Sequence, residues 1–241
     1  TLAVLAAVPF LIFALLATRK MVGLHWPLAF VPLVMLLLAL RLSSATLQRL
    51  TFFLAGLTVV QMIAVATIAF LPMETWKKHR LYDGIVLTVK SQELLAQVAP
   101  YGKDYVFASD GYSNAVTLGY NARRYFFVFG VGSGHARHDD IMTDLRTLAG
   151  RNILVLRKSE PQLEDYQPYF RSVRIDSFES HGARYWRVFG DGFDYPTYRE
   201  RVLTQVRDRY YRMPAWLPSA GCYFCDRYFP GESCAPGQQP K

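Results

Sequence analysis

The richest cluster of reactive side chains follows a short apolar run near the middle of the chain. It reads Gly130-Val131-Gly132-Ser133-Gly134-His135-Ala136-Arg137-His138-Asp139-Asp140. A glycine loop between a strand and a helix N-terminus can bind an anion through free backbone N–H groups. The pattern therefore predicts a candidate ligand loop. Its predicted contact residues are Gly132, Ser133, His135, Arg137 and Asp139.

Other interpretations of this loop require different chemistry. Its glycine spacing is neither the GxGxxG of dinucleotide-binding folds nor a Walker loop. The GxSxG turn of the serine hydrolases is absent, so Ser133 beside His135 does not indicate a catalytic triad. The structural alternative is a strand-to-helix turn in which glycines supply positive φ and Asp139 caps the next helix. The ligand loop and the structural turn both stay open at this point.

A second group of polar residues lies between two apolar runs near the start of the chain. Arg19 and Lys20 end the first run, and His25 and Trp26 precede the second. Cations at the end of a spanning helix can hold a lipid phosphate, and Trp favours headgroup depth. We expect Arg19, Lys20, His25 and Trp26 to bind a lipid phosphate. The alternative is that these residues only anchor the topology.

The three cysteines, Cys222, Cys225 and Cys234, all lie near the C-terminus. Cys222 and Cys225 have CxxC spacing, which occurs in redox pairs and as half of a zinc site. Because no second CxxC and no nearby His pair accompany it, we predict structural cysteines and no metal site. An extracytoplasmic compartment would permit one disulfide, whose pairing the sequence leaves open. Whether the protein uses a cofactor is left open by the sequence.

The first 73 residues are unlike the rest of the chain in charge. They contain four basic residues and no acidic one, so the remainder carries about half of the net charge of +8. Three apolar runs, each close to the length that spans a hydrocarbon core of about 30 Å, predict three transmembrane helices. Their expected bounds are about 2–18, 24–40 and 50–72. The rest lacks a Lys/Arg run with interleaved aromatics, which argues against nucleic acid as a partner.

Residues 74–229 alternate short β-type runs with amphipathic stretches, followed by a flexible tail at 230–241. This alternation predicts a soluble α/β domain with a mostly parallel sheet. Predicted strands are 84–89, 104–108, 125–129 and 152–157, the last three at the centre of the sheet. Helical spacing occurs at 91–99, 112–121, 139–149 and 195–211. Residues 170–178 and 183–189 predict an antiparallel hairpin at one edge.

Several segments resemble a known family. The stretch FLIFALLATRKMVGLHWPLAF resembles the FxxFS-(R/K)…WP segment of the GT-C type integral-membrane glycosyltransferases that use polyprenyl-phosphate sugars. That superfamily includes the protein O-mannosyltransferases and the lipid A aminoarabinose transferase. DYVFASDGYSNAVTLGYNA, GSGHARHDDIMTDLRTLAGRNILVLRK and GFDYPTYRERVLTQVRDRYYRMPAWLP are similar to the soluble part of bacterial members.

The resemblance implies that this chain is the C-terminal portion of a polytopic glycosyltransferase, which transfers a sugar from polyprenyl phosphate to a cell-envelope acceptor. Its implied partners are the polyprenyl-phosphate sugar lipid, the bilayer and the N-terminal transmembrane part of the same protein. The family's catalytic Asp lies in its first extracytoplasmic loop. Residues 1–73 contain no acid to match it, so we expect no catalytic residue in this chain and no activity from it alone.

The resemblance also bears on location. Lys77, Lys78 and Arg80 follow the third apolar run, and counting positive charges would put the soluble domain in the cytoplasm. In the family this domain is periplasmic, so we expect a multi-pass protein of the inner membrane with an extracytoplasmic domain. The alternative function is a non-enzymatic, membrane-anchored α/β domain that binds an envelope polymer or a partner protein.

Overall fold

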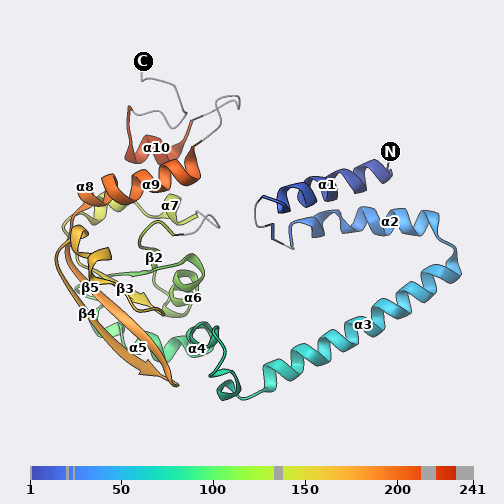
Figure 1. Ribbon diagram of the computed structural model, residues 1–241, viewed down its shortest axis with the longest axis horizontal. Helices are drawn as coiled ribbons and strands as arrows, with labels where there is room; N and C mark the ends of the chain where they lie inside the picture. The colour runs from blue at the N-terminus through green and yellow to red at the C-terminus, as the bar shows by residue number, and fades with distance from the viewer. Residues whose placement is uncertain (1, 20–21, 24, 133–137, 213–220, 232–241) are drawn as a thin grey trace. The chain divides into compact units, whose positions relative to one another are not determined.

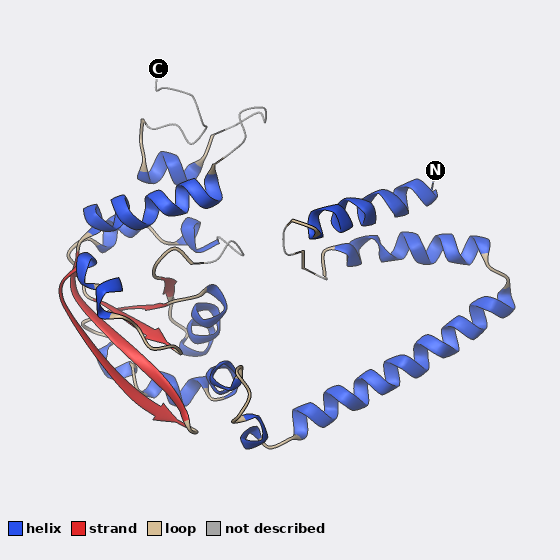
Figure 2. Cartoon of the chain, in the orientation of Figure 1, coloured by secondary structure: helices blue, strands red, loops and turns tan. Residues whose placement is uncertain are grey.

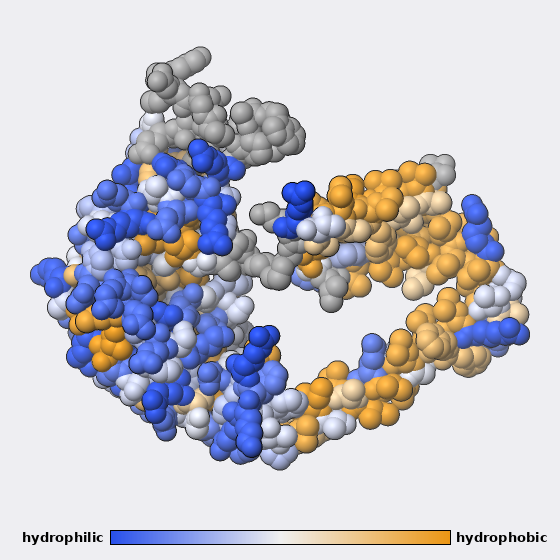
Figure 3. All heavy atoms as spheres, in the orientation of Figure 1, coloured by the Kyte–Doolittle hydropathy of each residue, from blue (hydrophilic) through white to orange (hydrophobic). Residues whose placement is uncertain are grey.

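The chain forms two compact units, Thr1–Leu71 and Pro72–Lys241. The computed structural model describes residues 2–19, 22–23, 25–132, 138–212 and 221–231. Figure 3 shows that the two units differ in surface chemistry: the helices of the first are covered mainly by hydrophobic residues, and the second is mainly hydrophilic. Each unit is described by itself below.

The first unit is helical (Figure 1). Its elements are α1 (Leu2–Ala17), a 3-10 turn (Pro27–Phe30), α2 (Val31–Arg41) and α3 (Ser44–Phe70). The ring of Phe13 on α1 lies 6.2 Å from the rings of both Trp26 and Phe30, so α1 packs against the start of the second apolar segment. The Ser43 hydroxyl accepts a hydrogen bond from the Thr46 N–H at 3.3 Å and caps α3.

The prediction of three transmembrane helices was wrong. Among the described residues, one helix, Ser44–Phe70, is long and apolar enough to cross a membrane, and its apolar stretch is not buried. At 1.5 Å per residue, the 16 residues of α1 span about 24 Å, short of a hydrocarbon core of about 30 Å. The second segment falls further short because Pro27–Phe30 forms a 3-10 turn, which leaves 11 α-helical residues in α2.

The second unit contains a five-stranded sheet with the order β2-β1-β3-β5-β4 (Figure 2). The strands are β1 (Val106–Ser109), β2 (Phe127–Val128), β3 (Ile153–Arg157), β4 (Phe170–Ser180) and β5 (Ala183–Phe193). β1 pairs in parallel with β2 and β3, whereas β3–β5 and β5–β4 are antiparallel. The sheet is therefore mixed, which corrects the predicted mostly parallel sheet: the hairpin folds back so that β5, not β4, lies beside β3.

The predicted hairpin at one sheet edge is confirmed. β4 and β5 pair from Phe170↔Phe193 to Ser180↔Ala183, and β4 is the outermost strand. The two-residue turn has His181 at φ 53° and Gly182 at φ 77°, the backbone that tight hairpins require. The strained His181 is held from two sides, because its carbonyl accepts from the Tyr82 hydroxyl at 2.7 Å and its Nε2 lies 2.7 Å from a Glu93 oxygen.

Helices cover both faces of the sheet. On one face α4 (Tyr82–Val89), α5 (Ser91–Ala96) and α6 (Tyr112–Ala122) pack against Leu154 and Leu156 of β3. On the other face a 3-10 turn (Leu145–Leu148), the helical segment that begins with α8 (Tyr195–Tyr198) and includes α9 (Thr204–Val206), and α10 (Tyr223–Tyr228) pack against Ile153 and Val155. Alternate residues of β3 thus contribute to two separate hydrophobic cores.

Two strand predictions in this unit were wrong. Residues 84–89 belong to helix α4, whose buried face is formed by Tyr82, Val86 and Leu87. A short β-branched run is ambiguous between a buried strand and a buried helix, and only the position of Tyr82 outside the predicted strand reveals the helical spacing. The segment 125–129, predicted at the sheet centre, contains the edge strand β2. β2 is an edge because the chain passes from it over β1 to β3.

Candidate functional site

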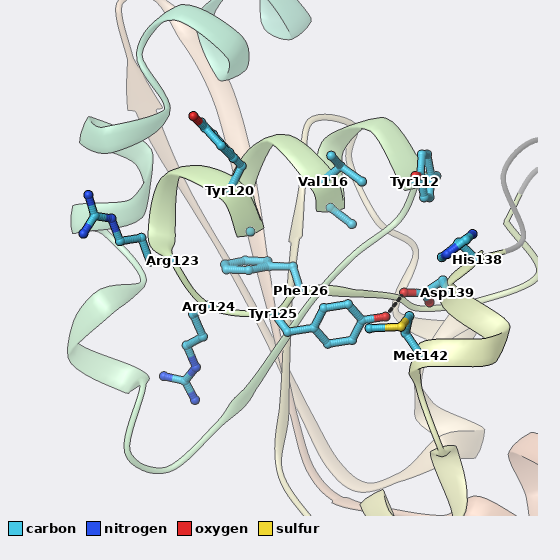
Figure 4. A pocket seen from close by; sticks show the side chains of 12 residues that line it. Tyr112, Val116, Tyr120, Arg123, Arg124, Tyr125, Phe126, His138, Asp139 and Met142 are labelled. Carbon is cyan, nitrogen blue, oxygen red and sulfur yellow. Dashed lines mark hydrogen bonds between the residues drawn. The ribbon is translucent and has the colours of Figure 1, made fainter.

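A cavity of about 430 Å³ lies beside the edge strand, between α6 and α7 (His138–Met142). Its volume is within the range of small-molecule sites. Figure 4 shows its walls: α6 on one side, the segment leading into β2 on another, and α7 opposite. The lining residues are Tyr112, Ala115, Val116, Gly119, Tyr120, Arg123, Arg124, Tyr125, Phe126, His138, Asp139 and Met142.

The end of α6 shapes this cavity. Arg123 ends the helix in the left-handed conformation at φ 47°, which turns the chain sharply into the segment before β2. Gly119 allows that segment to approach closely, since a Cβ there would lie 3.1 Å from the Arg124 carbonyl oxygen. The turn brings Tyr125 and Phe126 against α6, and Phe126 is buried while Tyr125 stays half exposed. The cavity wall is thus formed by residues adjacent in sequence.

Asp139 organises the polar side of the cavity. Its carboxylate accepts a hydrogen bond from the Tyr125 hydroxyl, drawn as a dashed line in Figure 4, and another from the Val128 N–H at 2.8 Å. The Tyr125 hydroxyl also lies 2.8 Å from the Thr143 hydroxyl. Burial, and then the hydrogen bond to Asp139, raise the pKa of Tyr125. Tyr125 therefore remains a protonated donor at neutral pH, and both Asp139 oxygens already have partners.

The remaining lining is mainly apolar and partly exposed. Val116, Tyr120 and Met142 expose 49%, 83% and 65% of their surface. Exposed aromatic and aliphatic faces with a few polar groups suit a ligand that has one apolar face and hydroxyl groups at its edge. Arg123, at the end of α6, also lines the cavity and makes no ion pair among the described residues. Arg124 is engaged: its guanidinium stacks on Phe107 at 4.4 Å and donates to the Tyr105 carbonyl at 3.2 Å.

A second cluster lies where the parallel strands β1 and β3 end. Asp110 directly follows β1, and its Oδ2 lies 3.2 Å from Nε of Arg157, the last residue of β3. Arg157 also donates to the Tyr166 hydroxyl at 2.9 Å, and Asn114 donates to Asp110 Oδ1 at 3.2 Å. Ligands of open α/β sheets bind at such carboxyl ends, where connections leave in opposite directions. Here β1 leads to β2 on one side, and β2 leads to β3 on the other.

The contact between Arg157 and Asp110 is an ion pair without a well-aligned hydrogen bond. Nε is buried and lacks an aligned hydrogen-bond acceptor although the carboxylate is only 3.2 Å away. The two charges still attract each other, because Coulomb attraction at this distance needs no hydrogen-bond alignment. Sequence reasoning overlooked both residues. The available signal was their position directly at the ends of two predicted strands.

The predicted ligand loop is only partly described. Ser133, His135 and Arg137 lie outside the described residues. Gly132 has φ 64°, and its carbonyl accepts a hydrogen bond from the Tyr210 hydroxyl at 3.2 Å. Of the two predicted contact residues that the structure describes, Gly132 and Asp139, Asp139 lines the cavity described above.

The residues predicted to bind a lipid phosphate are also only partly described. Lys20 lies outside the described residues, and Arg19 and His25 are exposed. Trp26 is 47% exposed, and its ring lies 6.2 Å from those of His25 and Phe13. His25 and Trp26 are therefore neighbours at the start of the second apolar segment.

The cysteines and the other titratable groups indicate no metal centre among the described residues. No group of three or more His, Cys, Asp or Glu side chains there could hold a metal ion. Cys225 is disulfide-bonded, whereas Cys222 is a half-buried free thiol. The two cysteines of the CxxC sequence are thus not bonded to each other. Comparisons with protein-family models, with curated proteins and with solved structures find no match to this chain.

Proposed function

We propose that this chain is part of a membrane glycosyltransferase that transfers a sugar from a polyprenyl-phosphate donor to a cell-envelope acceptor on the extracytoplasmic face. The observation that carries the proposal is the convergence of two family-like segments. The segment 104–122 forms β1 and α6, and the segment 132–158 includes α7 and β3. Residues of both segments line the cavity, although residues 123–131 separate the two segments in sequence. Segments that resemble a family and meet at one cavity favour a shared function.

Within this proposal the cavity contacts the acceptor. Tyr faces and aliphatic side chains can pack on the apolar face of a sugar ring, and the Tyr125 hydroxyl and Arg123 can bond its hydroxyl groups. No acid in residues 1–73 matches the family's catalytic Asp. The proposal therefore gives this chain binding roles: acceptor contact by the cavity, and donor phosphate contact by Lys20 with Arg19, His25 and Trp26.

Transfer from a polyprenyl-phosphate sugar to envelope acceptors, measured in membranes that contain the full-length protein, tests the function. Val116→Trp would fill the cavity, and Leu163→Trp is the control because Leu163 is exposed and outside it. Loss of one apolar contact worth about 1.4 kcal/mol lowers acceptor use about tenfold. Equal transfer by both variants would remove the cavity from the proposal. Absence of transfer by the wild-type protein with every donor tried would overturn the proposal itself.

A donor-site variant tests the second binding role. Lys20→Gln should lower transfer about 10- to 150-fold, since a charge-assisted contact is worth about 1.5–3 kcal/mol. Transfer is normalised to correctly inserted protein, because topology anchoring predicts a change in protein level or orientation instead. Activity within about twofold of wild type would leave Lys20 a topology anchor.

The extracytoplasmic location is supported by the disulfide of Cys225, because disulfides persist in oxidising compartments. Cys222 provides the assay, since it is a free thiol. A membrane-impermeant maleimide should label Cys222 in intact cells whose outer barrier is opened, and Cys222→Ser should abolish that signal. Labelling only after lysis would place the domain in the cytoplasm.

A second candidate function is a membrane-anchored α/β domain that binds an envelope polymer or a partner protein. It is favoured by the finding of one candidate span followed by a compact unit. The transfer assay separates the two functions: an anchored binding domain retains acceptor polymer on the wild-type protein and loses it in Val116→Trp, with no sugar transferred in either case.

A further inference from the structure

Helix α4 has two apolar faces, and only one of them is buried. Tyr82, Val86 and Leu87 lie in the core. Beside this buried face Leu81, which precedes the helix, aligns with Ile85 and Val89 at spacings of four residues, so the three form one stripe. Leu81 is 56% exposed and Val89 is 64% exposed. A surface helix of a soluble domain normally carries polar residues on this side.

Basic residues flank this stripe. Arg80 and Lys158 line the same shallow hollow of about 600 Å³ as the stripe, together with one acidic residue, Asp83. The Lys158 ammonium lies over the helix, 3.8 Å from where a Cβ of Gly84 would be. Lys77 and Lys78 precede Arg80 and are exposed. None of these four cations forms an ion pair with another described residue, so their charge is directed to solvent.

The position of the stripe in the chain points to its occupant. The candidate membrane span ends at Phe70, ten residues before Arg80. Ten residues cover at most about 35 Å, and the 3-10 turn at Met73–Trp76 shortens that reach. The stripe is therefore tethered within about 35 Å of the end of the candidate span, which allows it to reach a bilayer surface. Exposed apolar residues ringed by Lys and Arg are the composition of helices that lie at the headgroup boundary.

We propose that the α4 stripe docks on the surface of an anionic bilayer. Leu81, Ile85 and Val89 lie at the headgroup boundary, and Arg80 and Lys158 contact lipid phosphates. A lipid surface matches this patch better than a protein does, because the stripe is only three residues long while the unpaired cations need several anionic partners. Docking would hold the domain against the membrane from which its polypeptide emerges. The inference depends on the candidate span and not on the proposed transfer reaction.

Spin labelling of the full chain in nanodiscs tests the docking. Nitroxides are placed at Val89→Cys and, as matched control, at Val116→Cys, an exposed Val of α6 in the same unit. Both are made with Cys222→Ser, which removes the described free thiol. In nanodiscs with 30% anionic lipid, we expect the label at residue 89 to be accessible to oxygen and protected from a water-soluble nickel complex. The label at residue 116 should show the reverse.

The contribution of the two cations is tested with Arg80→Gln and Lys158→Gln, each made in the Val89→Cys background. Each cation near an anionic surface changes the docked-to-undocked ratio about fivefold. Both variants, and a change to zwitterionic lipid or high salt, should therefore move the label at residue 89 towards water. Exposure of this label to the nickel complex in anionic nanodiscs would overturn the proposal. Protection that is unaffected by lipid charge, salt and both substitutions would also overturn it, and would indicate a protein contact instead.

Discussion

Removal of the Asp139 carboxylate should destabilise the second unit by opening its sheet edge. Val128 is on the edge strand β2, and the hydrogen bonds of β2 to β1 use its neighbours, as in Phe129 N–H to the Ser109 carbonyl at 2.9 Å. The Val128 N–H therefore points away from the sheet, and the Asp139 carboxylate accepts it at 2.8 Å. Asp139→Ala leaves the Val128 N–H without its acceptor and removes one of the two partners of the Tyr125 hydroxyl.

The expected loss of stability follows from the two hydrogen bonds of Asp139 and from their exposure to water. A hydrogen bond to a charged group contributes about 1.5–3 kcal/mol when it is buried. Tyr125 is 49% exposed, so water replaces part of its loss. We therefore expect Asp139→Ala to cost about 2–3 kcal/mol, below the sum of two buried bonds. Asp139→Asn keeps an acceptor for Val128 and should cost about 1 kcal/mol, as should Tyr125→Phe.

Urea denaturation of the full chain in detergent, followed by near-ultraviolet circular dichroism, measures these values. Asp104→Ala is the control, because Asp104 is an exposed carboxylate with no side-chain hydrogen bond among the described residues. A double-mutant cycle between Asp139 and Tyr125 isolates their mutual contribution. If Asp139→Ala matched the control within about 0.5 kcal/mol, Asp139 would not close the sheet edge.

Three further predictions concern the sheet. Leu154→Asp puts an unpaired charge on the central strand, where Leu154 is fully buried, and should cost about 3 kcal/mol or more in urea denaturation. Gly190→Ala should cost about 1–3 kcal/mol in the same assay, because its Cβ would lie 2.5 Å from the Phe170 ring. Burial, and then the hydrogen bond to Asp191, raise the pKa of Tyr105 from 10.0 to about 12. The stability that Tyr105 contributes is thus complete below pH 10 and is lost as the pH rises through about 12. In Tyr105→Phe the free energy of unfolding should therefore fall less steeply with pH over that interval.

Local patterns predicted those parts of the fold that depend on neighbouring residues. The strand at 152–157 and the hairpin around His181 and Gly182 are visible as apolar alternation and turn residues. The strand order required information from distant residues. Nothing near Phe127 indicates that β2 lies at an edge, because that depends on the chain crossing β1 to reach β3. The prediction of the second membrane span was wrong for a local reason, because hydropathy does not reveal that Pro27 begins a 3-10 turn.

The candidate site, like the fold, could be predicted from the sequence only in part. Asp139 was predicted because it lies in an unusual loop, but its use as an acceptor for Val128 depends on how the loop returns to the edge strand. Val116 and Met142 carried no signal, since isolated apolar residues on amphipathic helices are expected to be buried. The ion pair of Asp110 with Arg157 joins residues 47 positions apart, and only the parallel pairing of β1 with β3 brings them together.

The residues at the N-terminus of α7 indicate which charge a ligand there can carry. The α7 N-terminus carries two carboxylates, and both accept hydrogen bonds: Asp140 from the Tyr211 hydroxyl at 2.6 Å, and Asp139 from Tyr125. α7 is five residues long, too short for a strong helix dipole. An anion would therefore meet repulsion from these two carboxylates. A neutral, hydroxyl-rich group can still bond with tyrosine hydroxyls and carboxylates. Within the proposed function, the described start of α7 thus suits an acceptor sugar better than a donor phosphate, whose contacts the proposal gives to the residues around Arg19 and His25.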